Sequence, residues 1–356
     1  MEFFGKYLSM TTLSYDHLEA MLTPIGLWQH YERGQPALYH GYSIDDEARG
    51  LIVGLRYWQT GVAPEFYGHL AQVCFQFVEG AAITSGSCAG QYHNFCDEHG
   101  KWLDSVGSED SFGRTLWGLG VACAVDAPFA LREAAEKLLR GSLPVLPTIR
   151  PHYLRAKAFV ILGLTEANLG LEQIQMLGDA LADKYEACRD PHWHWYEDQM
   201  TYCNARLPQA LFAASRRFPA ASRYRKIAVE SLDFLLEKTR NLQGSHDPIG
   251  NLRLTEAGWF TRYDDSPPLF DQQPVDAGAL VECCAEAFHA TGELRYKQAA
   301  EDAFGWYHGK NVHGLPVFEA ATGGVFDALN AEGLNINQGA ESVLSVHLAH
   351  QALHTL

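Results

Sequence analysis

Residues 113–125, with the sequence GRTLWGLGVACAV, decide the fold. Their apolar side chains recur with a helical period and cover most faces of the helix instead of one stripe. A helix that is apolar all round is buried on all sides, and small residues let neighbouring helices approach closely. We therefore expect this segment to lie in a crowded inner ring of helices.

Three further segments have the same character. Each is rich in apolar and small residues and follows a long connector: 48–58 (ARGLIVGLRYW), 156–164 (AKAFVILGL) and 276–287 (DAGALVECCAEA). The helices expected after such segments, for example 127–140 and 171–186, are amphipathic and carry charges on one face. This alternation predicts inner helices paired with outer ones.

The helical period extends over nearly the whole chain, and alternating strand patterns are hard to find. Twelve helices are predicted, over residues 14–22, 45–60, 64–82, 109–124, 127–140, 151–168, 171–187, 203–217, 220–240, 272–291, 293–309 and 338–354. Short connectors, rich in Gly, Pro or Ala, alternate with long ones that are dense in aromatic, acidic and amide residues. The long connectors are 23–44, 83–108, 141–150, 188–202, 241–271 and 310–337.

Six inner helices paired with six outer ones predict an all-α fold, an (α/α)6 barrel or six-hairpin toroid, in a single domain over residues 1–356. The ring would close by pairing 14–22 with 338–354, and all long loops would open at the N-termini of the inner helices. A solenoid of helix pairs is the alternative, but the loop lengths are too unequal for a regular repeat.

Composition narrows the class of function. The 356 residues carry 27 Lys and Arg against 43 Asp and Glu, a net charge of −16 that argues against a nucleic-acid partner and suits a small neutral or cationic ligand. No apolar stretch is long enough to cross a bilayer, so no membrane association is expected. Eight cysteines without a CxxC pair, and a start without the pattern of a signal peptide, favour the cytoplasm.

Polar clusters lie in the long loops or in the first turn of the following inner helix. Five acidic residues are the candidate catalytic groups: Asp46, Glu109, Asp110, Glu197 and Asp198. The alternative role of such acids is to cap a helix, because carboxylates accept its free N–H groups. Caps do not require the aromatic and amide residues found beside them, so these clusters favour carbohydrate recognition.

Sugar rings stack on aromatic side chains, and carboxylates and amides bind their hydroxyl groups. The candidate substrate-binding residues are His40, Tyr42, Asp45, Arg114, Trp193, Trp195, Tyr196, Asn204, Arg206, Asp271, Gln272, Asn337 and Glu341. Arginines recur near the start of successive inner helices at Arg49, Arg114, Arg155 and Arg206. We expect them mainly to pair with carboxylates beneath the pocket floor, with contact to the ligand as the alternative.

Glycosidic chemistry needs one carboxyl group as acid and one as base. Glu197 or Asp198 is the expected acid, because Trp193, Trp195 and Tyr196 could desolvate its carboxyl group and raise its pKa. Asp46 or Asp110 would then activate water.

Other chemistries find no support in the sequence. GxSxG, P-loop and HExxH motifs are missing, and no cofactor is expected. His347, His350 and His354 share a helical spacing, but no carboxylate or Cys accompanies them, so no metal site is expected.

The clusters HGYSIDDEARGLIV, SVGSEDSFGRTLWGLG, WHWYEDQMTYCNARLPQAL, FDQQPVDAGALV and GLNINQGAESVLS resemble an uncharacterised, glycosyltransferase-associated group of bacterial proteins in the six-hairpin glycosidase superfamily. The resemblance implies the toroid, a carbohydrate-active role and a functional association with glycosyltransferases or mannoside-processing enzymes. One position departs from the pattern, since Cys203 stands where an Asp is expected.

Three functions remain open at this stage. The first is an inverting glycoside hydrolase that acts on a short oligosaccharide. The second is a sugar epimerase or isomerase in which His40, His152, His192 or His194 carries protons. The third is a noncatalytic saccharide-binding partner of a glycosyltransferase.

Overall fold

A computed structural model of the chain describes residues 13–125, 130–148, 153–220, 222–239, 252–254, 260–264 and 270–356. Within these ranges the twelve predicted helices are confirmed. The inner helices are α3 (Ile44–Thr60), α5 (Glu109–Ala124), α7 (Leu154–Ala167), α9 (Arg206–Arg217), α11 (Pro274–Thr291) and α13 (Ala340–Leu353). The outer helices are α2 (Asp16–Met21), α4 (Pro64–Ala81), α6 (Leu131–Ser142), α8 (Leu171–Cys188), α10 (Ser222–Thr239) and α12 (Leu294–Gly305).

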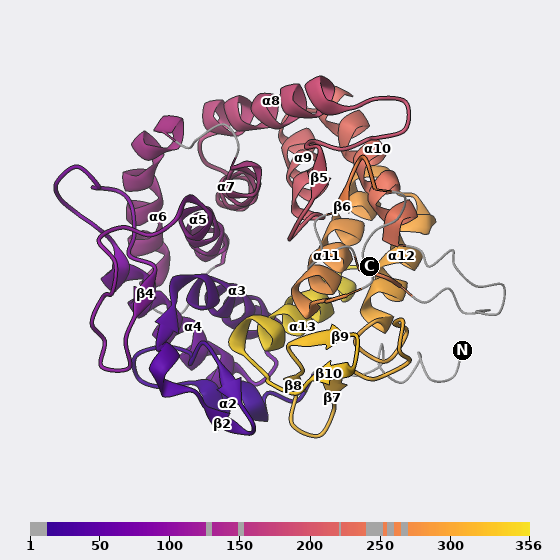
Figure 1. Ribbon diagram of the computed structural model, residues 1–356. Helices are drawn as coiled ribbons and strands as arrows, with labels where there is room; N and C mark the ends of the chain where they lie inside the picture. Colours follow the sequence, from indigo (N-terminus) through magenta and orange to yellow (C-terminus); the bar gives the residue numbers. More distant parts are fainter. Residues whose placement is uncertain are drawn as a thin grey trace.

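The inner helices form a closed ring. Each contacts the next, from α3 through α5, α7, α9 and α11 to α13, and α13 contacts α3 again. Figure 1 shows this ring along its axis, with the outer helices around it. The short first helix α2 packs against α13, as the closure prediction required. The predicted helix over 127–140 begins later, at Leu131, and residues 126–129 and 151–152 lie outside the described ranges.

Small residues set the spacing of the inner ring. A Cβ atom on Gly120 of α5 would lie 2.1 Å from the backbone oxygen of Gly163 on α7, and one on Gly163 would lie 2.2 Å from that of Leu116. Because both obstacles are backbone atoms, neither can move aside cheaply. Gly120 and Gly163 thus allow close packing between α5 and α7, and Gly118 of the segment GLG faces Ala48 of α3 instead.

Short strands in the long loops were not predicted, because two or three residues are too few to show an alternating pattern. They are β1 (Tyr31–Glu32), β2 (Gln35–Pro36), β3 (Tyr42–Ser43), β4 (Phe95–Cys96), β5 (Gln199–Met200), β6 (Phe260–Thr261), β7 (Phe318–Glu319), β8 (Gly324–Val325), β9 (Ala328–Asn330) and β10 (Gly333–Asn335). All pair as two-stranded antiparallel ladders, and β3–β4 and β5–β6 each join two different long loops.

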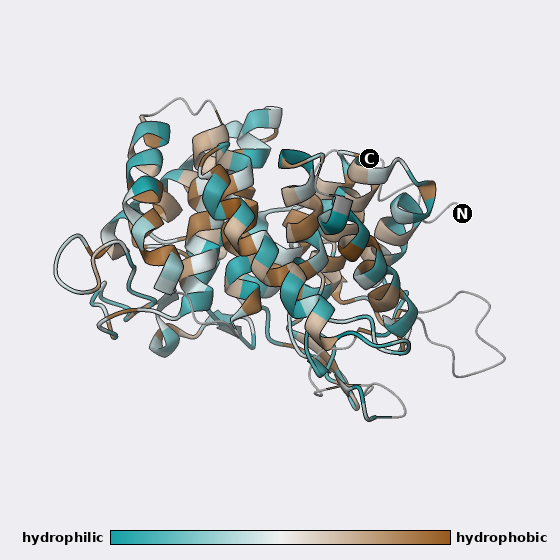
Figure 2. Ribbon diagram, turned by 90° about the horizontal axis from the view of Figure 1, so that it is seen from above, coloured by the Kyte–Doolittle hydropathy of each residue, from teal (hydrophilic) through white to brown (hydrophobic). Residues whose placement is uncertain are grey.

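The long loops gather at one end of the toroid, where the inner helices begin (Figure 2). The opposite end, where those helices finish, has short connections such as the turn at Gly61 between α3 and α4. None of the helices in the described ranges combines the length and apolar character needed to cross a membrane. The two ends of the ring thus differ in the length of the loops that they carry.

Replacing Gly120 by Ala should lower the free energy of unfolding by about 1–3 kcal/mol, because the new methyl group collides with the backbone of α7. Gly80→Ala is the matched control: Gly80 is also helical, and no atom lies within 4 Å of its added Cβ. It should leave stability unchanged or raise it by up to about 1 kcal/mol. Thermal melts followed by circular dichroism measure both, and equal melting temperatures for the two variants would contradict close packing at Gly120.

Candidate active site

The first turn of α3 supplies the centre of the mouth, which is the end of the ring where the inner helices begin. The hydroxyl group of Ser43 accepts the backbone N–H of Asp45 and caps the helix. Arg49, one turn further on, donates from Nη1 to Oδ1 of Asp46 at 3.1 Å and from Nη2 to Glu341 at the start of α13. One guanidinium group thus joins the first inner helix to the last.

A second arginine connects α3, α5 and the loop before α9. The Nε atom of Arg114 lies 2.9 Å from Oδ2 of Asp110 and 4.0 Å from Oδ2 of Asp45. Its Nη2 group donates to the Sγ atom of Cys203 at 3.7 Å. The hydroxyl group of Tyr202 donates to the other oxygen of Asp110 at 3.1 Å. Asp110 is therefore held from two sides.

The remaining two arginines also pair with acids. Arg155 of α7 lies 2.5 Å from Oε2 of Glu197 and donates to Oδ1 of Asn204 at 3.1 Å. Arg206 of α9 lies 2.6 Å from Oε2 of Glu282 on α11. The expectation that arginines at the inner-helix starts pair with carboxylates is confirmed for all four.

A cavity of about 330 Å³ opens between α3, α11 and α13 at this end. Four of the predicted site residues line it: Asp45, Asp46, Asp271 and Glu341. The structure adds the polar residues Gln29, His30, Gln273, Asp327 and Asn335, and the ring of Phe95. Gln273 and Asn335 lie in polar clusters noted in the sequence, whereas Gln29, His30, Phe95 and Asp327 belonged to no such cluster and are brought to the cavity only by the fold.

The carboxyl groups of the cavity have pKa values shifted in opposite directions. Burial raises the pKa of Asp45, although Arg114 and Arg49 oppose the shift. Burial, only partly offset by Arg49, raises the pKa of Asp46 to about 7. Burial also acts on Glu341, but the charges of Arg49 and Arg114 outweigh it and lower the pKa of this group. The cavity thus places two carboxyl groups with raised pKa values beside one whose pKa is lowered.

Asp276, in the first turn of α11, is a further buried carboxyl group that the catalytic candidates did not include. Burial and the charge of Glu341 hold its pKa well above the ordinary value, and it hydrogen-bonds the backbone of Cys203. Its Oδ2 atom has no hydrogen-bond partner among the described residues. Its position in the first turn of an inner helix is the sequence feature that could have identified it. An acid at this position is, however, also typical of a simple helix cap.

The aromatic cluster of residues 193–196 is packed into the scaffold, and neither Glu197 nor Asp198, the two expected acids, is among the residues that line the cavity. Trp195 and Tyr196 are fully buried, and Tyr196 shares a hydrogen bond of 2.9 Å with Ser231 of α10. Trp193 packs against Phe234 of the same outer helix. These rings support the wall between inner and outer helices and cannot stack on a sugar. Asp198, which they were expected to desolvate, is 69% exposed and faces Arg262 instead.

Other predicted substrate-binding residues are also buried in the scaffold. Tyr42 stacks on Trp28, Gln272 accepts a hydrogen bond from the indole of Trp306, and Arg206 lies over Trp117. Seven predicted substrate-binding residues are nearly inaccessible to solvent and do not take this role: Tyr42, Trp193, Trp195, Tyr196, Asn204, Arg206 and Gln272. His40 and Asn337 are half-buried near the mouth, and neither is among the residues that line the cavity.

Of the histidines proposed as proton carriers, the three that the structure describes, His40, His192 and His194, are not among the residues that line the cavity. His192 is exposed, His194 lies beside Phe234, and His152 falls outside the described residues. His30 is the histidine that faces the cavity, and its ring centre lies 4.3 Å from that of His40. Burial, with the neighbouring His40, lowers the pKa of His30.

The histidines of α13 belong to the core. His347 is fully buried, and Nδ1 of His350 lies 2.7 Å from the hydroxyl oxygen of Tyr57. Over the described ranges no group of three or more His, Cys, Asp or Glu residues is arranged to hold a metal ion.

No family model matches the chain, and no curated protein matches its sequence. Solved structures do match it in fold. A D-mannose isomerase superposes with a TM-score of 0.74 at 14% identity, covering 100% of this chain and 98% of that one. A cellobiose 2-epimerase from Spirochaeta thermophila gives 0.72 at 10% identity, covering 99% and 96%.

An α-1,6-mannanase from Salegentibacter gives a TM-score of 0.60 at 13% identity, covering 98% of this chain and 97% of that one. That structure is an inactive variant with two consecutive aspartates replaced by alanine, in complex with α-1,6-mannotetrose. These similarities show the fold, which is the (α/α)6 toroid predicted from the sequence.

The raised pKa of Asp46 predicts a pH-dependent stability. Because the folded protein holds this proton up to about pH 7 and the unfolded chain releases it near pH 3.9, the free energy of unfolding falls as pH rises between these values. Asp46→Asn removes this pH dependence. The free energy of unfolding of the variant, relative to that of the unmodified protein, should therefore increase from pH 5 to pH 8. Urea unfolding at both pH values measures it, with the exposed Asp198→Asn as control. A stability difference that is equal at both pH values would contradict the assignment.

Proposed function

We propose that this protein is a glycoside hydrolase that acts on a short oligosaccharide, with Asp45 as the acid and Glu341 as the base. One observation carries the proposal: both carboxyl groups reach the cavity, and their surroundings shift their pKa values in opposite directions. The side chain of Asp45 is 28% exposed and that of Glu341 is 46% exposed. Such a divergence is what separates acid from base in a pair of carboxyl groups.

The proposed step needs no group beyond these and a water molecule. Asp45 donates its proton to the glycosidic oxygen as the bond from this oxygen to the anomeric carbon breaks. Glu341 takes a proton from the water, whose oxygen forms the new bond to the same carbon. Transfer of one proton from Glu341 back to Asp45 through solvent restores both groups. The product would have the inverted anomeric configuration.

Asp46 and Arg49 serve as positioning residues in this proposal. Arg49 is almost fully buried and binds both Asp46 and Glu341, so it fixes the direction in which the Glu341 carboxylate points. Its charge also keeps Glu341 ionised. Asp46 holds the guanidinium from behind and is itself only slightly accessible.

The rest of the cavity suits a neutral sugar. The amides of Gln29, Gln273 and Asn335 can divide the hydroxyl groups between them, and the partly exposed ring of Phe95 offers an apolar face. Acidic side chains outnumber basic ones along the lining, which disfavours anionic substrates. Since the mannanase variant became inactive on loss of two consecutive aspartates and Asp45 precedes Asp46 here, α-1,6-linked manno-oligosaccharides are the first substrates to test.

Asp45→Asn and Glu341→Gln should each lower the release of reducing ends from the cleaved oligosaccharide by about 10²- to 10⁴-fold, because each removes one proton-transfer group. Asp198→Asn should retain activity, since Asp198 lies outside the cavity. The pH profile should be bell-shaped, with Glu341 setting the acidic limb and Asp45 the alkaline limb. Full turnover in both Asp45→Asn and Glu341→Gln would rule out the pair, and NMR detection of a retained anomer would rule out the inverting course.

A sugar epimerase or isomerase is the second candidate. The isomerase and the epimerase superpose with higher TM-scores than the mannanase, and His30 faces the cavity near Glu341. Under this alternative His30→Gln should abolish the incorporation of solvent deuterium into an uncleaved sugar, whereas Asp198→Asn should not. A saccharide that binds and is neither cleaved nor labelled would favour the noncatalytic role.

A further inference from the structure

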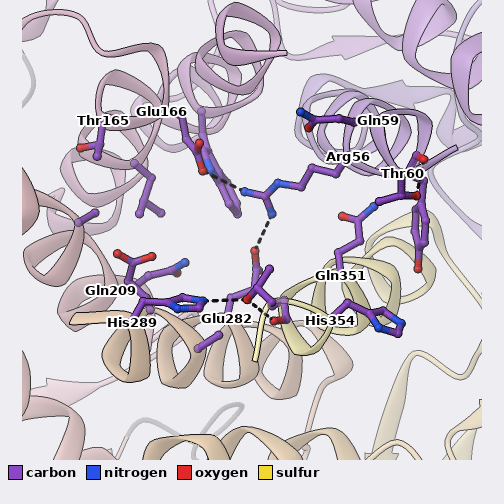
Figure 3. A pocket seen from close by; sticks show the side chains of 18 of the residues that line it. Arg56, Gln59, Thr60, Thr165, Glu166, Gln209, Glu282, His289, Gln351 and His354 are labelled. Carbon is purple, nitrogen blue, oxygen red and sulfur yellow. Dashed lines mark hydrogen bonds and ion pairs between the residues drawn. The ribbon is translucent and has the colours of Figure 1, made fainter. Parts of the chain in front are cut away.

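A cavity of about 670 Å³ lies at the opposite end of the toroid, where the inner helices finish (Figure 3). Each carboxyl group among its described lining residues faces an arginine. Glu166 pairs with Arg56, Glu282 pairs with Arg56 and Arg206, and Glu286 pairs with Arg216. These ion pairs connect one inner helix to another, so the acids of this cavity serve the packing of the ring. At the mouth, in contrast, an aromatic side chain is exposed.

This side chain belongs to Tyr202, in the loop that precedes α9. Its exposed fraction is 42%, whereas Trp193, Trp195 and Tyr196 of the same long connector are nearly inaccessible to solvent. Tyr202 lies at the mouth because α9 begins there, at Arg206. An aromatic ring that remains open to solvent at the mouth can stack on a sugar ring, which the three buried rings cannot do.

Three contacts hold Tyr202 in place. Its hydroxyl group donates to Oδ1 of Asp110 at 3.1 Å. The guanidinium carbon of Arg155 lies 5.1 Å from the centre of its ring, and Nε of Arg155 donates to its backbone oxygen at 2.6 Å. Arg155 is itself almost fully buried and pairs with Glu197. The ring is therefore fixed before a ligand binds, and little side-chain entropy is lost on binding.

Arg114 relates Tyr202 to the proposed acid, Asp45. The Nε atom of Arg114 lies 4.0 Å from Oδ2 of Asp45 and 2.9 Å from Oδ2 of Asp110, so these two carboxyl oxygens are at most 6.9 Å apart. Asp110 in turn accepts the hydroxyl group of Tyr202. The Nη2 group of Arg114 donates to Cys203, the residue after Tyr202. The line from Asp45 through Asp110 to Tyr202 thus leads away from the cavity, toward α5 and α9.

We propose that Tyr202 is a specificity-determining residue, whose open ring face stacks on the sugar that leaves with the glycosidic oxygen. This inference rests on the proposed function. Asp45 protonates the glycosidic oxygen, so the leaving sugar lies beside Asp45, on the side where Asp110 and Tyr202 follow. The sugar with the anomeric carbon occupies the cavity, where Glu341 activates the water. Asp110 is partly exposed and accepts a hydrogen bond from a hydroxyl group of the leaving sugar.

Tyr202→Ala tests this stacking with two substrates that place the same sugar in the cavity. The leaving group is a sugar in α-1,6-mannobiose and a fluoride ion in α-mannosyl fluoride. The ratio of kcat/KM for mannobiose to kcat/KM for the fluoride should fall by about tenfold or more in Tyr202→Ala, because only mannobiose loses the stacking contact. Tyr202→Phe keeps the ring and should lower the ratio by less than about threefold.

Leu171→Ala is the control, since Leu171 is comparably exposed, at 49%, but lies on the outer helix α8. It should leave the ratio unchanged. If both substrates are cleaved and Tyr202→Ala does not change the ratio, the role of Tyr202 is overturned and the hydrolase proposal stands.

Binding measured without cleavage separates the two proposals further. Glu341→Gln lacks the proposed base, so calorimetric titration of this variant with α-1,6-mannotetrose measures binding alone. Adding Tyr202→Ala should weaken the binding by about tenfold or more, whereas adding Leu171→Ala should not alter it. Circular dichroism checks that each variant folds, and Tyr202→Leu replaces Tyr202→Ala if the latter does not.

The outcomes of this titration are distinct. If mannotetrose binds in a manner that depends on Tyr202, and the unmodified protein does not cleave it, the hydrolase proposal fails and the stacking role of Tyr202 remains. Absence of mannotetrose binding, or equal binding with and without the ring of Tyr202, overturns that role.

Discussion

The ion pair between Arg49 and Glu341 is the interaction on which fold and site both depend. It connects α3, the first inner helix, with α13, the last, at the point where the ring closes. The guanidinium is buried, so its charge needs compensation, and Asp46 on the same helix accepts a second hydrogen bond from it. The same contacts lower the pKa of Glu341 and leave its carboxylate facing the cavity. The contact that closes the ring is therefore also the one that prepares Glu341 to act as the proposed base.

The inner helices α5, α7 and α9 repeat this arrangement with different partners. Arg114, Arg155 and Arg206 each bind an acid supplied by another part of the chain or by the same helix. Because a buried arginine without a partner would destabilise the fold, these pairs fix how neighbouring helices begin relative to one another. Between them, glycines such as Gly120 and Gly163 allow the backbones to touch. The ring is held by polar contacts at its mouth and by close apolar packing below.

Much of the fold, and part of the candidate site, could be predicted from the sequence alone. The length of the long loops, the small residues of α5 and the charged face of the outer helices were enough for the toroid and for its mouth. The pairing of arginines with acids also followed from their recurrence at helix starts. The exposure of each acid could not be predicted: Asp45 and Asp46 are adjacent and both line the cavity, yet the side chain of Asp45 is 28% exposed and that of Asp46 only 5%. Successive residues of a helix point about 100° apart, and only the neighbouring helices decide which direction is open.

The sequence by itself determined the helical period, the alternation of inner and outer helices and the end of the ring at which polar residues gather. These are properties of local spacing and composition. The tertiary structure decided which acids meet, because burial and pKa shifts depend on residues far apart in the chain, such as Arg49 and Glu341. It also placed Trp195 and Tyr196 in the core, where Tyr196 hydrogen-bonds Ser231 of α10, so that neither ring is exposed to a ligand.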